Sequence, residues 1–234
     1  MTLRFHFHPL ASFCHKALIA LYEKEIPFEP VLIDFGDPDS AAAFRTLWPM
    51  AKMPVLEDTA RGQLVAETSA VVEYLDRHYP GKIRFVSEDA DLVWQIRMWD
   101  SVFDSYVHEP MQKIVTDNLR PTGRNDLEGV EQAKAQLRQS YDFLEKSFAG
   151  RTWIVRDTFT LADCSAAPAL FYADTVVPFA PEHVWLADYL ERLMARPAYA
   201  RVLKEAEPYF KNVPVENKPI ISGRAAERER RRPK

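Results

Sequence analysis

Residues 51–57, with the sequence A-K-M-P-V-L-E, constrain this chain more than any other stretch. They place Pro54 at the start of a short apolar strand. Proline has no backbone N–H, so within sheets it is confined to the first residue of a strand, to an edge strand or to a bulge. We therefore expect the next residue, Val55, to offer its N–H and C=O groups to something other than a neighbouring strand.

A helix start follows closely on this strand. Gly62 marks a turn, residues 63–66 are typical of a returning strand, and Glu67, Thr68 and Ser69 open a helix. Acceptor side chains at a helix start cap its free N–H groups, and the N–H groups that stay uncapped can bind an anion. A backbone edge beside such a helix start suits a small, charged, peptide-like ligand.

Periodicity predicts a compact α/β unit in the first 80 residues. Apolar and polar residues alternate over 3–7, as in a half-buried strand, and apolar residues recur at helical intervals over 13–24. The further predicted elements are a strand at 27–33, a helix at 37–47, strands at 54–57 and 63–66, and a helix at 67–78. This order predicts one mixed sheet of four strands with helices packed on it.

The second part of the chain reads as an all-helical bundle after a linker at residues 81–88. Helices are predicted at 89–117, 127–148, 161 onward, 182–195 and 197–206. Pro110 is expected to interrupt or bend the first of them, because proline removes an internal hydrogen bond. Thr160 and Asp163 form a capping box, which assigns Asp163 a structural role. The helical domain spans residues 89–212.

Residues 213–234 form a proline-containing segment that ends in a basic run. It has no apolar face, so we expect it to be solvated and mobile. The functional alternative for the basic run is an anionic partner or a membrane surface.

The overall composition is that of a globular protein. The 234 residues are 47% hydrophobic and 27% charged, and the net charge of −4 gives no reason to expect nucleic-acid binding. Cys14 and Cys164 are too few for a disulfide framework and fit a cytoplasmic location. No run approaches the length of about 18 apolar residues that a membrane span needs, so none is expected.

Two motifs resemble the glutathione-binding half of the soluble, cytosolic glutathione transferases, in particular a bacterial serine- or cysteine-type member. They are K-x-P-x-L around Pro54 and E-T-S-A-x-x-x-Y-L from Glu67 onward. The resemblance covers roughly residues 3–210. It implies an α/β plus all-α fold class, in which a thioredoxin-like N-terminal domain (residues 1–80) with a mixed four-stranded sheet is followed by an all-helical C-terminal bundle.

The same resemblance implies a site for glutathione as co-substrate. The Met53–Pro54 bond would be cis, and Val55 would pair through its backbone with the cysteinyl part of glutathione. Glu67 and Thr68 would hold the γ-glutamyl end. The residues implied in binding are Lys52, Met53, Pro54, Val55, Glu67 and Thr68. The lysine of this set would either meet the glycine carboxylate or lie free in solvent.

The catalytic residue is predicted at the junction of the first strand and the first helix. A thiol reacts as its thiolate, and Ser12 could donate a hydrogen bond to the bound sulfur at the positive end of the helix. The position most often catalytic in serine- and cysteine-type transferases falls one residue earlier, on Ala11, and the simpler interpretation of Ser12 is an N-cap. Cys14 is the alternative catalytic residue, through a mixed disulfide with glutathione.

A substrate pocket is predicted from Leu10, Phe103, Tyr106, His108 and Met111. The last four lie on the first helix of the bundle, which in this family faces the glutathione sulfur, so they could line a pocket for an apolar electrophile. The alternative is that they are core residues, because aromatic side chains at helical spacing usually pack inside.

The sequence thus predicts a glutathione S-transferase that conjugates the glutathione thiolate to a small electrophile, a detoxification reaction. The alternatives are a glutathione-dependent isomerase, dehalogenase or thiol reductase on the same site, or a non-catalytic interaction module, which the missing hydroxyl at Ala11 and the basic tail would explain. The resemblance implies a homodimer. No metal is expected, because His6 and His8 have no acidic or cysteine partner at ligand spacing.

Overall fold

A mixed four-stranded sheet forms the first half of the protein. The computed structural model describes residues 2–224, 226 and 230. The strand order is β2-β1-β3-β4, with bounds Leu3–Phe7 for β1, Glu29–Leu32 for β2, Val55–Asp58 for β3 and Gln63–Ala66 for β4. The β1–β2 pair is parallel, whereas β1–β3 and β3–β4 are antiparallel. The predicted mixed sheet is therefore confirmed.

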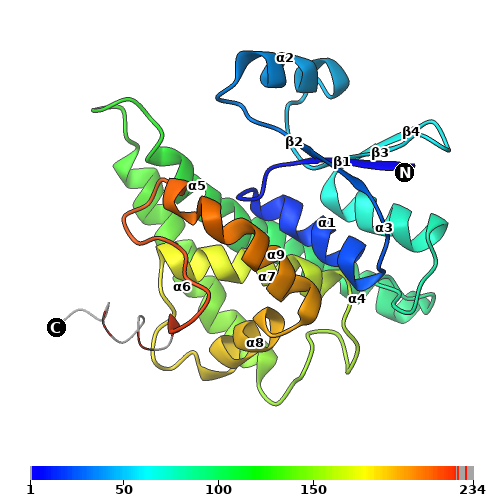
Figure 1. The fold of residues 1–234 in the computed structure, drawn as a ribbon. Coiled ribbons are helices and arrows are strands. Elements are labelled where there is room, and N and C mark those ends of the chain that lie inside the picture. The colour runs from blue at the N-terminus through cyan, green and yellow to red at the C-terminus, as the bar shows by residue number, and fades with distance from the viewer. Residues whose placement is uncertain (1, 225, 227–229, 231–234) are drawn as a thin grey trace.

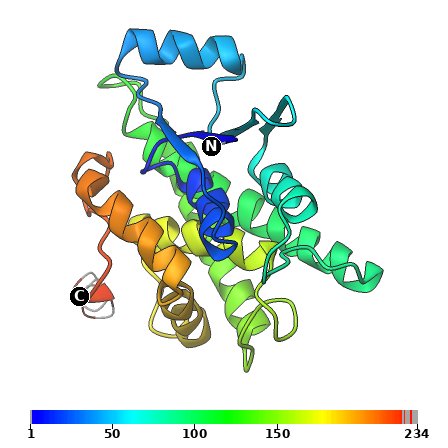
Figure 2. The same ribbon diagram turned by 45° about the vertical axis from the view of Figure 1, so that its right-hand side comes forward.

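Helices cover the two faces of this sheet unequally. Figure 1 shows α1 (Ser12–Glu23) and α3 (Thr68–His78) between the sheet and the rest of the molecule, while α2 (Pro38–Leu47) lies on the outer side. The view in Figure 2 shows the same separation of α2 from the helical half. The outer helix packs through Phe44 against Ile33 and Val55. Its N-terminus is capped by Asp37, which accepts hydrogen bonds from two backbone N–H groups.

The second half is entirely helical, as predicted. Its elements are α4 (Ala90–Val102), the π-helix η1 (Phe103–His108), α5 (Glu109–Asp117), α6 (Leu127–Phe148), α7 (Leu161–Val176), α8 (Val184–Met194), α9 (Pro197–Ala206) and the 3₁₀ helix η2 (Glu207–Asn212). Residues 81–88, the predicted linker, contain no helix or strand. The division of the chain into domains at this linker stays a prediction.

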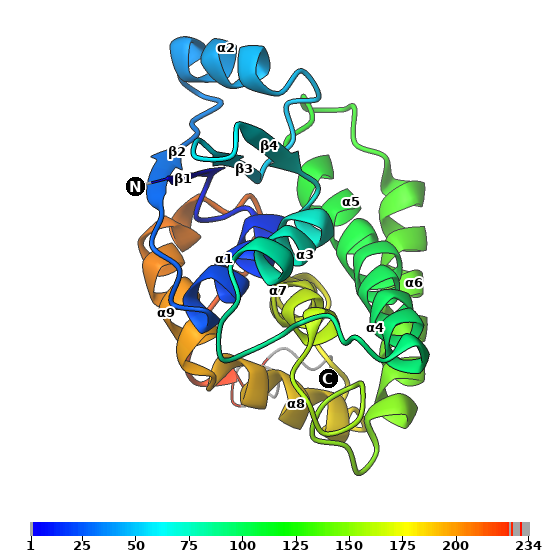
Figure 3. The same ribbon diagram turned by 90° about the vertical axis from the view of Figure 1, so that its right-hand side faces the viewer.

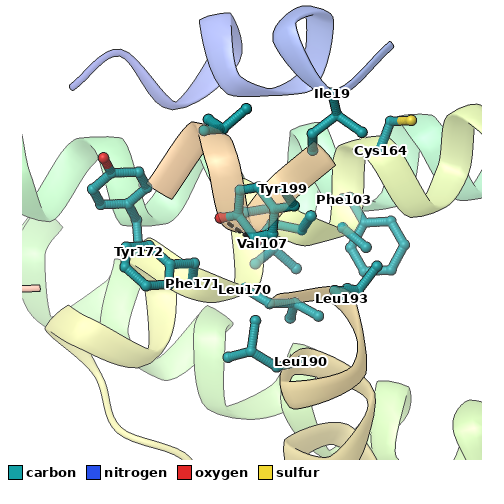
Figure 4. Packing of buried hydrophobic residues seen from close by; sticks show 14 of the residues in the cluster. Ile19, Phe103, Val107, Cys164, Leu170, Phe171, Tyr172, Leu190, Leu193 and Tyr199 are labelled. Carbon is teal, nitrogen blue, oxygen red and sulfur yellow. Dashed lines mark hydrogen bonds between the residues drawn. The ribbon is translucent and has the colours of Figure 1, made fainter. Parts of the chain in front are cut away.

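Helix α7 is the centre of the protein. Almost every residue of this helix is buried, and α1 packs directly against it, as the views in Figure 3 and Figure 1 agree. Figure 4 shows the shared core, in which side chains from five elements meet: Ile19, Phe103, Val107, Leu170, Leu190 and Tyr199. A wholly apolar helix is stable only in such an environment, so the composition of α7 explains its position.

The chain stays helical through Pro110, but the turn before this proline is a π-helix. An α-helical N–H at Pro110 would bond the carbonyl of Tyr106, and proline has no such donor. The chain instead forms the π-helical turn η1 just before the proline, and the hydroxyl of Ser140 donates to the freed Tyr106 carbonyl at 2.8 Å. The predicted interruption is thus a local change of helix type. π-Helical turns occur frequently at functional sites.

The capping box at the start of α7 is confirmed, and Asp163 is structural. Its buried carboxylate accepts from the N–H of Thr160 at 2.8 Å, from the N–H of Ile154 at 3.3 Å and from the Tyr189 hydroxyl at 2.5 Å. Burial raises the pKa of Asp163 to about 6. This side chain therefore ties α7 to α8 and to the loop before it.

The prediction of a solvated, mobile tail is wrong for the first part of that segment. Val213 is 5% exposed and Arg224 is 5% exposed. The Arg224 guanidinium donates to Asp174 at 2.6 Å and to the carbonyl of Phe171 at 3.1 Å, both on α7. A buried ion pair thus fixes the Arg224 end of this segment to α7. Positions 225, 227–229 and 231–234 of the predicted tail lie outside the described residues.

Over the residues that the structure describes, no helix combines the length and the apolar character needed to cross a bilayer.

Candidate functional site

The loop before β3 has the predicted cis Met53–Pro54 bond. The backbone of Val55, however, is not exposed as we expected. Val55 pairs with His6 of β1 on one side and with Ala66 of β4 on the other, and it has no exposed surface. The expectation that its backbone is free for a ligand is therefore wrong, because β3 is an interior strand. Met53 lies outside the strand and is half-buried, so its main chain takes no part in the pairing of β3.

The start of α3 is strained and has no side-chain cap. Glu67, the N-cap residue, has a φ of 63° and a ψ of 117°, and its exposed side chain makes no capping hydrogen bond. Positive φ costs a residue other than glycine about 1–3 kcal/mol, and such residues cluster at ligand sites. Thr68, the first residue of the helix, is 7% exposed. The first N–H groups of α3 therefore remain available to an anion.

A buried polar cluster holds this helix start against the helical half. The ammonium of Lys16, which has no exposed surface, lies 2.5 Å from Asp100 and 2.9 Å from Asp104. It also donates to Ser69 at 2.9 Å, and Ser69 donates to Asp100 at 2.7 Å. The hydroxyl of Ser165 on α7 completes the cluster by donating to Asp100. Burial raises the pKa of Asp104, and the charge of Lys16 opposes that shift.

Ser12 lies at the start of α1 but does not cap it. Ala11 is the N-cap residue, and Ser12 is the first helical residue, with 3% of its surface exposed. The Ser12 hydroxyl instead meets the imidazole Nε2 of His108 and the side-chain amide of Gln112, which donates at 3.2 Å. The N-cap interpretation of Ser12 is therefore wrong, and the serine joins α1 to η1 and α5.

His108 is a buried imidazole packed against an aromatic ring. It has no exposed surface, and burial together with the nearby charge of Lys16 lowers its pKa to about 3. The ring of Phe13 stacks on it, with centroids 3.9 Å apart and an interplanar angle of 8°. Within the described residues, His108 Nδ1 is buried without a hydrogen-bond partner. His108 is thus part of the packed junction between the two halves and does not line a pocket.

The thiol of Cys14 is closed off from any ligand. It has no exposed surface, and burial raises its pKa to about 12. A thiol of this kind carries almost no thiolate at neutral pH, and the thiolate is the reactive form. The geometry therefore opposes the alternative in which Cys14 forms a mixed disulfide with glutathione.

Two of the predicted pocket residues belong to the core. Phe103 is 0% exposed and Met111 is 2% exposed, and Figure 4 shows the Phe103 ring pointing into the cluster around α7. Phe103 and Met111 do lie on one side of the helical path, but that side faces the core of the protein. Tyr106 remains 55% exposed and Leu10 half-buried, so these two are the predicted residues that a substrate can still reach.

The histidines of β1 are engaged in other ways. His6 Nε2 lies 3.4 Å from a Glu57 carboxylate oxygen of β3, a proximity that sequence spacing did not reveal. The ring of His8 accepts from the backbone N–H of Leu10. No group of three or more histidine, cysteine or acidic side chains gathers in metal-binding geometry in the described part of the chain.

Sequence reasoning missed the partners of Ser12 and Lys16. Gln112 is separated from Ser12 by 100 residues, and Asp104 is separated from Lys16 by 88 residues. The available signal was a lysine placed directly before the apolar run 17–21 of a helix. A charge in such a position requires a buried partner, although the pattern does not identify which acid supplies it.

Comparisons with known proteins agree with this geometry. Two family models match: "Glutathione S-transferase, N-terminal domain" over residues 5–82 and "Glutathione S-transferase, C-terminal domain" over residues 98–197. A glutathione S-transferase of Silene vulgaris is 26% identical over 216 residues, which cover 87% of this chain and 97% of the relative. A glutathione S-transferase-like protein, LUC7, of a Fusarium species is 35% identical over 130 residues, which cover 56% of this chain and 58% of that relative's length.

A solved structure has the same fold. It is a glutathione S-transferase of Methylobacterium radiotolerans in complex with glutathione sulfonate, with a TM-score of 0.74 and 25% identity. The superposition covers 86% of this chain and 93% of the other.

Proposed function

Because this chain belongs to the glutathione S-transferase family, we propose that it binds glutathione in the first half and transfers its thiolate to a small electrophile. The observation that carries the proposal is the start of α3, where a strained, uncapped helix N-terminus lies next to the buried Thr68. A carboxylate fits that position through the N–H groups and the helix dipole. Glutathione carries such a group at its γ-glutamyl end.

The remaining proposed contacts involve the loop before β3. The main chain of Met53 takes the role that the sequence assigned to Val55 and pairs with the cysteinyl part of glutathione. Lys52 is exposed beside it, and its ammonium meets the glycine carboxylate. Glu67 and Thr68 hold the γ-glutamyl end. These residues span the site from the mouth of β3 to the start of α3.

We place the glutathione thiol at the start of α1. There the free N–H groups of the first helical turn and the hydroxyl of Ser12 stabilise the thiolate. Tyr106 and Leu10 border the space for the electrophile. Glutathione-dependent isomerisation and dehalogenation would use the same thiolate, and product analysis separates them from conjugation. Thiol reduction through Cys14 has no support, because that side chain is inaccessible.

A homodimer is part of the proposal. Trp94 and Met98 lie four residues apart on α4, so they project from the same side of the helix. They are 56% and 43% exposed. Covering this pair with a second copy of the chain would remove apolar surface from water. The glutamate variant of each residue should shift the protein from dimer to monomer in size-exclusion chromatography with light scattering. The cytoplasmic location stays a prediction.

Isothermal titration with glutathione tests the site. Thr68→Ala removes one hydrogen bond to a charged group, which is worth about 1.5–3 kcal/mol, so we expect the Kd to rise roughly 10- to 100-fold. Glu67→Ala should weaken binding as well. Thr46→Ala, an exposed threonine on α2, is the matched control and should leave the Kd unchanged. Equal affinities of Thr68→Ala and the wild type would remove the site assignment.

Turnover then separates an enzyme from an interaction module. A glutathione transferase conjugates glutathione to a general electrophile such as a halogenated nitrobenzene, and Ser12→Ala should slow that reaction. Binding of glutathione without turnover on a panel of electrophiles and disulfides would favour the non-catalytic module, which the missing hydroxyl at Ala11 motivates.

A further inference from the structure

The hydroxyl of Ser12 is surrounded by groups from the helical half, and we propose that His108 and Gln112 are positioning residues that turn the Ser12 hydrogen toward the glutathione sulfur. Both groups meet the same oxygen: Gln112 from α5 at 3.2 Å and His108 from η1 in a short contact. The inference rests on the proposed function, because it specifies how Ser12 donates to the bound thiolate.

The argument begins with the bonding capacity of a hydroxyl group. A serine oxygen has two lone pairs and carries one hydrogen. The side-chain NH₂ of Gln112 can only donate, so it occupies one lone pair of the Ser12 oxygen. The remaining question is whether His108 Nε2 donates to the second lone pair or accepts the hydrogen of Ser12.

The surroundings of the imidazole decide this question. His108 is fully buried, and its burial together with the nearby charge of Lys16 disfavours protonation, so the ring is neutral and carries one N–H. Its Nδ1 is buried without a partner in the described residues. If the hydrogen were on Nδ1, an N–H donor would be orphaned, whereas a hydrogen on Nε2 leaves only an unpaired acceptor. Buried orphan N–H groups are the rarer of the two.

Both lone pairs of Ser12 are then occupied. With Nε2 of His108 and the amide of Gln112 donating, the Ser12 hydrogen has no acceptor in either group. It is free for a ligand at the start of α1. The stacked ring of Phe13 holds the imidazole in one orientation, so the hydroxyl is preorganised as a donor. Hydrogen bonds in such a chain strengthen one another.

The arrangement also explains why the helical half matters to the thiolate. The sulfur would lie next to a residue of the first half, but the direction of the donated hydrogen is set by side chains from η1 and α5. Neither His108 nor Gln112 needs to touch glutathione. Their effect should therefore appear in the pKa of the bound thiol and leave the affinity for glutathione nearly unchanged.

Gln112→Glu is the sharpest test, because the new side chain has the same length and accepts where the amide donated. Gln112 is only half-buried, so the variant is expected to fold. The Ser12 hydrogen would turn toward the carboxylate, and the pKa of the bound thiol, measured by the ultraviolet absorbance of the thiolate, should rise by about 1 unit, a roughly tenfold loss of thiolate at a given pH below that pKa. Gln139→Glu on the exposed side of α6 is the matched control.

The new carboxylate of Gln112→Glu can also raise the pKa of the bound thiol directly, through its charge. A double-mutant cycle with Ser12→Ala separates this direct effect from the effect that passes through Ser12. If Gln112 acts through Ser12, most of the shift caused by Gln112→Glu disappears in the Ser12→Ala background. An equal shift in both backgrounds would overturn the proposal. Absence of glutathione binding in the wild type would instead refute the proposed function, so the two failures are distinguishable.

The tautomer can be measured on the unaltered protein. Nitrogen-15 NMR of the histidine side chains distinguishes a hydrogen on Nε2 from one on Nδ1. We expect the His108 ring to carry its hydrogen on Nε2 throughout the neutral pH range. A hydrogen on Nδ1 would mean that Ser12 donates to His108, and the proposal would be wrong.

Discussion

Replacement of Lys16 by methionine should destabilise the fold strongly. The ammonium of Lys16 lies 2.5 Å from Asp100, 2.9 Å from Asp104 and 2.9 Å from Ser69, and its side chain has no exposed surface. Methionine fills similar space without a charge, so two carboxylates would remain in the cluster without their cation. Breaking a buried ion pair by removing one partner costs about 3–5 kcal/mol. The total stability of a domain is about 5–15 kcal/mol.

The loss should depend on pH in a defined direction. Burial raises the pKa of Asp104 above 3.8, and Lys16 lowers it again. Without Lys16, the pKa of Asp104 in the folded state therefore rises further, while the pKa in the unfolded state does not change. A carboxyl group with a raised folded pKa stabilises the fold below its unfolded pKa and loses that contribution as the pH rises through the folded pKa. Lys16→Met should thus be closest to the wild type in acid and furthest from it at neutral pH.

Urea unfolding followed by circular dichroism measures this difference at both pH values, with the free energy taken by linear extrapolation. Lys146→Met, an exposed lysine on α6, is the matched control and should change the stability by less than about 0.5 kcal/mol. Adding Asp104→Asn to Lys16→Met should recover part of the loss. A loss below about 1 kcal/mol, or the same loss at neutral pH and in acid, would refute the buried ion cluster.

Three further predictions concern other parts of the structure. Asp163→Ala removes the cap of α7 and leaves the Tyr189 hydroxyl without its acceptor, so urea unfolding should show a loss of about 2–4 kcal/mol; a loss within error would contradict the capping role. Glu67→Gly relieves about 1–3 kcal/mol of backbone strain and should keep or raise the melting temperature while weakening glutathione binding; a lower melting temperature would contradict the strain argument. Arg224→Leu breaks the pair with Asp174 and should cost about 3 kcal/mol and speed amide hydrogen exchange of residues 213–224, measured by mass spectrometry, whereas an unchanged exchange rate would mean that the arginine does not hold this segment.

The order and type of the elements could be predicted because the signals for them are local. Alternation over residues 3–7, helical spacing over 127–148 and the capping box at Thr160 each depend on a few neighbouring residues. The cis Met53–Pro54 bond came from the family resemblance. By contrast, the assignment of Val55 as the exposed residue failed because it depends on strand order, and a β3 that lies between β1 and β4 leaves no free edge at that position.

The pocket assignment failed for a related reason. Helical spacing places Phe103 and Met111 on one side of a helix, but it does not tell whether that side faces a cleft or another helix. Here α7 covers it. The same limit applies to Ser12: a serine at a helix start is usually a cap, and only the positions of His108 and Gln112, 96 and 100 residues later, give its hydroxyl another role.

Helix α1 carries two polar clusters that join the two halves, and they begin one turn apart at Ser12 and Lys16. One cluster reaches η1 and α5, where the thiolate donor is proposed to be oriented, and the other reaches the start of α3 through Ser69, where the γ-glutamyl carboxylate is proposed to bind. Buried polar groups that lose their hydrogen-bond partners are costly. The two halves can therefore adopt few relative positions that keep both clusters paired, and under the proposed function the same contacts would set the geometry around the thiolate and the γ-glutamyl carboxylate.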